Sequence, residues 1–349
     1  MTEPVRIVFV DRDPPSGFMA TDLELLQSTA RVERIVYPGR PTPSWILQSI
    51  RAVRRNDVVY AFFASEQALV PALVAAVLRR RFLLIPGGYD YANVPEHRYG
   101  LAARGLGWLP RLLGRLCTVA LPISDQSMWE FVAQVPSAAP RTARAYLAVD
   151  PATWPDPGVE RDPDQVVTVG YVDEEAWSRK GIDRFVEAAR QDPGRRYVLA
   201  GRLVESVARR IDADRPANLS CPGRLEHDDL RRLLWGSGVY AQLSWHETFG
   251  VAMAEAMLCG CVPVVRASAA LHEVAGPWAV VAEGEPAAAD VAAIDRAAGI
   301  ARGSSSAERQ AMADDIAARF SAARRVEALA DAAAGRVPVE PPNRATDEA

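Results

Sequence analysis

Two carboxylates and the backbone between them are the first residues of this chain that could do chemistry. Glu247 precedes a predicted helix that starts near Thr248 or Phe249, and Glu255 lies on that helix. Carboxylates accept hydrogen bonds from hydroxyl groups, and the unpaired N–H groups of a helix start can bind an anion or a sugar hydroxyl. Taken alone, each glutamate is better explained as a solvated acid, so a functional interpretation of the pair depends on the neighbouring residues.

A single ammonium group is the second such feature. Lys180 is the only lysine among the 40 Lys and Arg residues of the chain, and it lies between Arg179 and Gly181. Arginine and lysine are interchangeable on a solvated surface, but not where a compact ammonium must reach one phosphate. The position therefore favours phosphate binding, with chance retention as the alternative.

The elements that must position these residues form a predicted parallel sheet. Short apolar runs alternate with helical patterns over residues 166–265, which is the pattern of repeated βα units. Lys180 lies in the loop after strand 166–171, and Glu247 follows strand 238–243. Because ligands bind at the carboxyl ends of parallel strands, we expect these loops and the turn 221–225 to meet at one edge.

An earlier region shows the same alternation. Its strand 82–85 ends in Pro86-Gly87-Gly88-Tyr89-Asp90, where two glycines permit close approach of a ligand, although a tight turn is an equal explanation. No GxGxxG follows the first strand, so the nicotinamide dinucleotide fingerprint is absent. Residues 99–117 predict a basic amphipathic helix, which would lie on an anionic membrane surface or pack on the sheet.

The composition limits the class of protein. Hydrophobic residues make up 49% of the chain and charged residues 24%, which is typical of globular proteins. A net charge of −4 gives no sign of nucleic-acid binding, and the four cysteines show no metal-type spacing. We expect reduced cysteines, no metal and a cytoplasmic protein. A contact with the inner face of a membrane through helix 99–117 is the alternative to packing of this helix on the sheet. Residues 150–164 are rich in proline and acids, so we place a domain boundary there. The predicted layout is a first lobe over 1–150, a second over 151–312, a helix over 313–335 crossing back to the first lobe, and a disordered tail over 336–349.

The chemistry-bearing stretches resemble the signature of family 4 glycosyltransferases, which are retaining, nucleotide-sugar-dependent enzymes of the GT-B fold. The similar stretches are Glu247-Thr248-Phe249-Gly250, Glu255-Ala256-Met257, Gly260-Cys261-Val262-Pro263-Val264-Val265, and Val169-Gly170 followed by Lys180-Gly181-Ile182-Asp183. This resemblance covers residues 166–275, and the earlier region matches only in layout. It implies an α/β protein of two Rossmann-like lobes with an interlobe cleft.

The resemblance also implies roles for matched residues. Glu247 would approach the donor sugar, Glu255 the ribose, and Lys180 the diphosphate. The implied catalytic residues are Glu247, Lys180 and Asp90. The implied donor-binding residues are Arg179, Gly223, Arg224, Leu225, Thr248, Phe249, Gly250, Val251 and Glu255. The implied acceptor or cleft residues are Gly17, Gly88, Tyr89 and His97, with a surface role as the alternative for His97.

One position departs from the family pattern. Many members carry arginine after the glycine of the Val-Gly pair, and that arginine joins lysine in binding phosphate. This chain has Tyr171 there, so Arg179, Arg202 or Arg224 would have to supply the second cation.

The activity implied is transfer of a hexose from a nucleotide diphosphate sugar to an acceptor hydroxyl, with retention and without a metal or other cofactor. The acceptor would be a glycan, a glycolipid or a secondary metabolite. A nucleotide-sugar epimerase on the same fold and a catalytically silent nucleotide-sugar binder are the alternatives.

Overall fold

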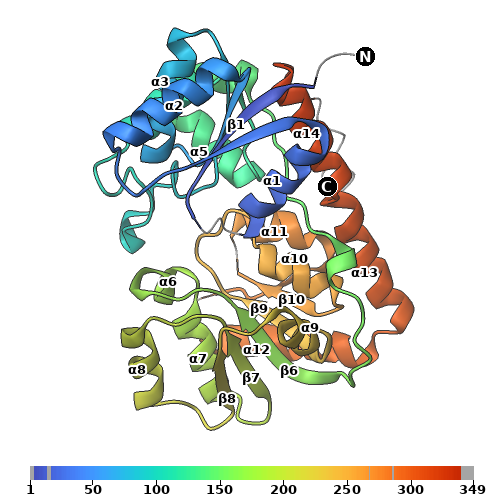
Figure 1. Cartoon of the computed structure of the whole chain (residues 1–349). Coiled ribbons are helices and arrows are strands. Elements are labelled where there is room, and N and C mark those ends of the chain that lie inside the picture. Colours follow the sequence, from blue (N-terminus) through green and yellow to red (C-terminus); the bar gives the residue numbers. More distant parts are fainter. Residues whose placement is uncertain (1–3, 14–16, 267, 285–286, 339–349) are drawn as a thin grey trace. The chain divides into compact units, whose positions relative to one another are not determined.

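The computed structural model describes residues 4–13, 17–266, 268–284 and 287–338, so most of the tail predicted over 336–349 lies outside the described residues. The chain divides into two compact units. One holds the described residues up to Ala148 and those from Phe320 onward, and the other is Val149–Arg319. Each unit is built on one parallel β-sheet with helices around it (Figure 1).

The first unit contains a five-stranded sheet in the order β2-β1-β3-β4-β5. Its strands are β1 (Arg6–Asp11), β2 (Arg31–Val36), β3 (Val58–Phe62), β4 (Arg81–Ile85) and β5 (Val119–Ala120). Its helices are α1 (Gly17–Thr29), α2 (Pro43–Arg55), α3 (Glu66–Val77), α4 (Trp108–Leu116), α5 (Asp125–Gln134) and α14 (Ala322–Ala333). Strand β3 is buried along its whole length, as expected for a strand covered on both faces of a parallel sheet.

A buried ion pair joins the last helix to the first unit. The Arg325 guanidinium on α14 donates to Asp22 Oδ1 at 2.8 Å and Oδ2 at 2.5 Å, and to the Ala145 carbonyl at 2.7 Å. The Tyr60 hydroxyl donates to Asp22 Oδ2 at 2.5 Å. Arg325 and Asp22 are both almost fully buried, so these hydrogen bonds compensate for two desolvated charges.

The second unit contains a six-stranded sheet in the order β11-β10-β9-β6-β7-β8. Its strands are β6 (Asp162–Val169), β7 (Arg196–Ala200), β8 (Leu219–Gly223), β9 (Ser237–Gln242), β10 (Val262–Val265) and β11 (Val280–Val281). Its helices are α6 (Glu174–Arg179), α7 (Ile182–Gln191), α8 (Glu205–Ala213), α9 (His227–Trp235), α10 (Val251–Leu258), α11 (Ala269–Ala275), α12 (Ala287–Gly303) and α13 (Ser306–Arg319).

Two predicted helices differ from those observed. The helix expected over 99–117 begins only at Trp108, because Gly100 and Gly105 adopt φ of +100° and +76° in the turns before it. A membrane contact through this segment stays a prediction, and the helix that would make it is the shorter α4. The single helix expected over 313–335 is instead two helices, α13 and α14, since the Ser321 side chain caps a new helix by accepting from Arg324 N at 3.3 Å.

No helix of the described chain combines the length and the apolar character that crossing a membrane requires.

Candidate functional site

The topology of the second sheet places two of the predicted loops side by side. The chain passes outward from β6 through β7 to β8, then returns to place β9 on the other side of β6. Open α/β sheets bind ligands at the carboxyl ends of strands where the order reverses in this way. Lys180 follows β6 and Glu247 follows β9, so this reversal brings the predicted ammonium and carboxylate to the same part of the sheet edge.

Hydrogen bonds to backbone carbonyls hold these two loops together. The Trp245 amide donates to the Arg179 carbonyl at 2.8 Å, and the Ser244 hydroxyl donates to the Lys180 carbonyl at 3.4 Å. Gly181 adopts a φ of +65°, and a Cβ there would lie 2.0 Å from the Leu243 carbonyl oxygen. Only glycine therefore permits this approach, which fixes the position of the Lys180 loop against the Glu247 loop.

The Lys180 ammonium lies beside the end of β6. A Cβ built at Gly170 would be 3.8 Å from Lys180 Nζ. The side chain is half-buried, and among the described residues no carboxylate forms an ion pair with it. Its positive charge is consequently available to an anion.

The Glu247 carboxylate is held in one orientation. The Gln242 side-chain amide donates to Oε2 at 3.1 Å, and the Thr248 backbone amide donates to Oε1 at 3.1 Å. Glu247 is only half-buried, so its remaining lone pairs can accept from a ligand. Sequence reasoning missed Gln242; a polar residue ending an otherwise buried strand was the signal.

The helix after Glu247 begins later than predicted. Helix α10 starts at Val251, because Gly250 adopts a φ of +90° and acts as its N-cap. Thr248 and Phe249 form the preceding turn and are 7% and 2% exposed. The Phe249 ring therefore belongs to the core, and only the backbone of this turn and of the helix start can meet a ligand.

Glu255 is a half-buried carboxyl group on α10 with no hydrogen-bond partner among the described residues. Burial raises the pKa of Glu255 to about 7. Burial also raises the pKa of the Tyr240 hydroxyl far above its usual value, and the negative charges of Glu255 and Glu247 raise it further. The Tyr240 hydroxyl lies 3.4 Å from both the nitrogen and the oxygen of Val169, so both carboxylates lie near the end of β6.

Three glycines bring the ends of β6, β7 and β8 together. The Gly201 amide donates to the Gly223 carbonyl at 2.8 Å, and a Cβ at Gly201 would lie 1.9 Å from the Gly170 carbonyl oxygen. Arg224, just after Gly223, is exposed, and Leu225 is half-buried. The predicted turn 221–225 therefore lies at the same edge, two strands from Lys180.

Arg179 takes a different place from the one predicted. Its guanidinium is buried, with Nε 3.2 Å from Glu175 Oε1 and Nη1 3.3 Å from the His246 carbonyl oxygen. Arg179 thus links the Lys180 loop to the Glu247 loop through buried contacts. Tyr171, by contrast, is 49% exposed.

Asp90 in the first unit also faces inward. Its carboxylate is fully buried and accepts from the backbone amides of Ala64 at 2.8 Å, Gly87 at 3.1 Å and Gly88 at 2.9 Å. Burial raises the pKa of Asp90 to about 6, although these hydrogen bonds oppose the rise. The structure places Asp90 as a support for its loop, not as a group exposed to a ligand.

The other predicted first-unit residues lie on turns or helix ends. Tyr89 is half-buried, with its ring 5.2 Å from the Tyr99 ring and 5.5 Å from the Arg104 guanidinium. Gly17 is the exposed first residue of α1, Gly88 has a φ of +108°, and His97 is half-buried at the end of a short 3₁₀ turn.

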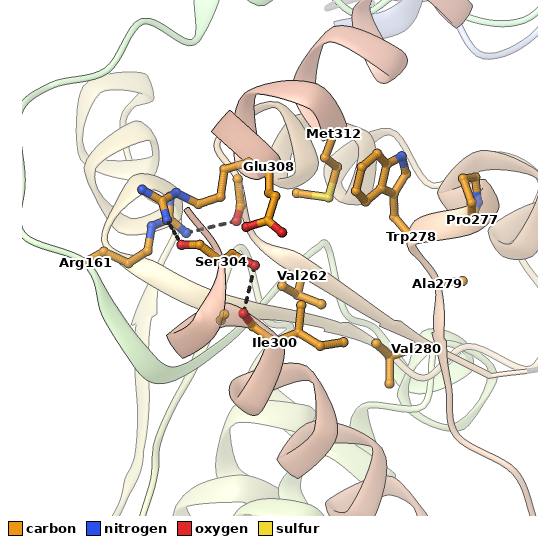
Figure 2. A pocket seen from close by; sticks show the side chains of 13 residues that line it. Arg161, Val262, Pro277, Trp278, Ala279, Val280, Ile300, Ser304, Glu308 and Met312 are labelled. Carbon is orange, nitrogen blue, oxygen red and sulfur yellow. Dashed lines mark hydrogen bonds between the residues drawn. The ribbon is translucent and has the colours of Figure 1, made fainter. Parts of the chain in front are cut away.

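A cavity of about 170 Å³ lies elsewhere in the second unit, at the amino end of β10 (Figure 2). Val262, Trp278 and Met312 line it, and the Arg161 guanidinium there already donates to the Gly260 carbonyl at 3.1 Å. Ligand sites for drug-sized molecules usually measure roughly 300–1,000 Å³. This cavity is too small for a nucleotide sugar and lies at the wrong edge of the sheet, so the polar site at the carboxyl edge remains the candidate.

Comparison with known proteins finds a family similar to this unit. The sequence profile described as "Glycosyl transferases group 1" matches residues 157–299. The second unit is therefore similar to this family over most of its length. The matched residues include Lys180, Glu247 and Glu255, together with the ends of β6, β7, β8 and β9. No curated protein sequence matches the chain.

Solved structures extend the comparison to nearly the whole chain. Anabaena Alr3699/HepE in complex with UDP-glucose is 16% identical with a TM-score of 0.74, covering 94% of this chain and 99% of that one. A glycosyltransferase from Rickettsia africae is 13% identical with a TM-score of 0.71, covering 95% and 98%. Sucrose-phosphate synthase from Thermosynechococcus elongatus is 14% identical with a TM-score of 0.70, covering 95% and 98%. The two units together thus match the GT-B fold of these solved structures, which confirms the predicted class of two Rossmann-like α/β units.

Proposed function

We propose that this protein transfers a hexose from a nucleotide diphosphate sugar to an acceptor hydroxyl, with retention at the anomeric carbon. The observation that carries the proposal is the pairing of an unneutralised ammonium, Lys180, with an oriented carboxylate, Glu247, on loops joined by backbone contacts. A sugar nucleotide needs both groups, a cation for its phosphates and acceptors for its hydroxyls.

In this mechanism the bond between the anomeric carbon and the diphosphate oxygen breaks as the bond to the acceptor oxygen forms. Lys180 and the amides at the start of α10 stabilise the negative charge that develops on the leaving diphosphate. Glu247 accepts from a sugar hydroxyl and Glu255 from the ribose. The departing phosphate oxygen takes the proton of the acceptor, so no separate general base and no metal is required.

The first unit would supply the acceptor site in this proposal. Gly88, Tyr89 and His97 lie on the segment after β4, and Gly17 begins the helix after β1. Carboxyl ends of parallel strands are where such a unit presents a ligand.

The test begins with a thermal-shift screen of UDP, GDP, ADP and dTDP and of their sugar derivatives. A nucleotide at 100 times its dissociation constant adds about 2.7 kcal/mol of stability, so binding is readily seen. Release of the nucleoside diphosphate upon addition of an acceptor then measures transfer, and NMR of the product reports its anomeric configuration.

Each alternative predicts a different outcome. An epimerase would convert the nucleotide sugar without any acceptor. A silent binder would be stabilised by the nucleotide sugar but would release no nucleoside diphosphate. An inverted product would contradict retention while leaving the transferase proposal standing.

A further inference from the structure

We infer that Arg202 is the second cation of this site and binds the donor diphosphate together with Lys180. The inference rests on the proposed function and adds to it a residue on the strand next to β6. A donor diphosphate carries more negative charge than one ammonium can neutralise, so a second cation is needed within reach of the same phosphates.

The strand register puts Arg202 opposite Tyr171. Strands β6 and β7 pair in parallel with Val169 opposite Ala200, and a further bridge pairs Val172 with Leu203. The Val172 amide donates to the Arg202 carbonyl at 3.0 Å, so the two segments stay hydrogen-bonded, with the same offset, beyond both strand ends. The backbone of Arg202 therefore lies beside that of Tyr171 at the carboxyl edge of the sheet.

The two cationic residues flank one pair of glycines. Gly170 lies beside Lys180 Nζ, and Gly201, which precedes Arg202, lies against the Gly170 carbonyl. Both residues are glycines, so no side chain separates the two backbones at this point. Neighbouring strands lie about 4.8 Å apart, a distance that an arginine side chain spans easily. A phosphate seated on these glycines would therefore be within reach of both cations.

The charges at this edge leave Arg202 available. Arg184 and Arg266 are both engaged by the buried carboxylate of Asp290. Arg202 is exposed, and no described residue forms an ion pair or side-chain hydrogen bond with it. Arg224 is also exposed and unpaired among the described residues, but it follows β8, so two strand spacings, or about 10 Å, separate it from the end of β6.

The decisive experiment compares UDP with uridine on the full-length protein. If another nucleoside diphosphate stabilises the wild type more than UDP does in the thermal-shift screen, the experiment uses that diphosphate and its nucleoside in place of UDP and uridine. We expect R202Q to weaken UDP binding about tenfold, because a hydrogen-bonded charge is lost from the phosphates. Uridine has no phosphate, so its affinity, measured by NMR titration, should change less than about twofold.

Arg196 provides the matched control. It lies at the amino end of the same strand and forms an exposed pair with Asp162. R196Q removes the same charge at the opposite edge of the sheet, so UDP affinity should stay within about twofold of wild type.

A second variant tests the register itself. Adding Tyr171→Arg to R202Q should restore most of the lost UDP affinity, because the backbone of position 171 lies beside that of position 202. A purely structural role of Arg202 would not be rescued from the neighbouring strand.

Wild-type UDP affinity in R202Q overturns the inference, and so does an equal loss of uridine affinity or a failed rescue. If the wild type binds none of the nucleoside diphosphates, the proposed function itself fails, and this inference fails with it.

Discussion

Within the part of the chain that the structure describes, three buried charged groups of the first unit are satisfied by the protein, whereas three polar groups at the ligand edge of the second unit are not. In the first unit, Asp90 and the Asp22–Arg325 pair are buried and have their hydrogen bonds satisfied by the protein. In the second unit, Lys180, Glu255 and Arg202 have no such partner among the described residues. A polar group removed from water is costly to leave unpaired, so the half-buried Lys180 and Glu255 indicate a ligand, whereas the satisfied groups of the first unit indicate a scaffold.

Arg325 tests the scaffold side of this comparison and should show the largest effect. Arg325→Met leaves the Asp22 carboxylate buried without its cation, which should cost about 3–5 kcal/mol in the free energy of unfolding. The double variant D22N/R325M should recover part of that loss. Chemical denaturation measures both, and a loss below about 1 kcal/mol would contradict the assigned role.

Lys180 tests the open side. We expect Lys180→Ala to lower the transfer rate by about 10²–10³-fold, the usual effect of removing one group that stabilises a developing oxyanion. The melting temperature should stay near that of wild type, since the described structure gives the ammonium no protein partner. Arg209→Ala, at an exposed arginine of α8 paired with Glu205, is the control. Full activity in Lys180→Ala would contradict the proposed role of the Lys180 ammonium in the site.

Asp90 separates the two roles most directly. Asp90→Ala should destabilise the first unit by roughly 2–3 kcal/mol, because three buried amides lose their acceptor. Asp90→Asn keeps an acceptor oxygen, so it should lose less stability and keep most of its activity. An Asp90→Asn variant with native stability and no activity would make Asp90 a catalytic residue and break the comparison.

Glu255 should give the smallest effect, a pH dependence of donor binding. The pKa of Glu255 is raised to about 7, so the carboxyl group is largely protonated at pH 6 and ionised at pH 8. Only the ionised form offers both oxygens to the ribose hydroxyls, so donor affinity should rise severalfold across this range. E255Q should flatten the rise, and comparing it with wild type removes the titration of the nucleotide phosphate itself. An identical pH profile in both proteins would contradict the role.

The same pKa carries a stability prediction of fixed sign. Because the folded-state pKa lies above the unfolded value, Glu255 favours the folded state below the unfolded pKa, and this contribution is lost as pH rises towards 7. Denaturant midpoints between pH 4.5 and 7.5 should therefore fall more in wild type than in E255Q.

Local patterns were enough to predict the repeated βα units and the chemistry-bearing loops. Apolar runs and helical spacing depend on neighbours a few residues away, and so do the Glu247 and Lys180 motifs. Gly100 and Gly105 are also evident in the sequence, but the helical spacing of residues 99–117 led to a prediction that ran through them.

The sequence by itself determined which residues could bind phosphate and hydroxyl groups, and the order of the elements that carry them. Only the tertiary structure decided that Arg179 and Asp90 turn inward, that Gln242 holds Glu247, and that Arg202 lies opposite Tyr171. The physical reason is that burial and strand register depend on contacts between segments far apart in the chain. Residue type states what a side chain can do, whereas these distant contacts determine whether it is already occupied.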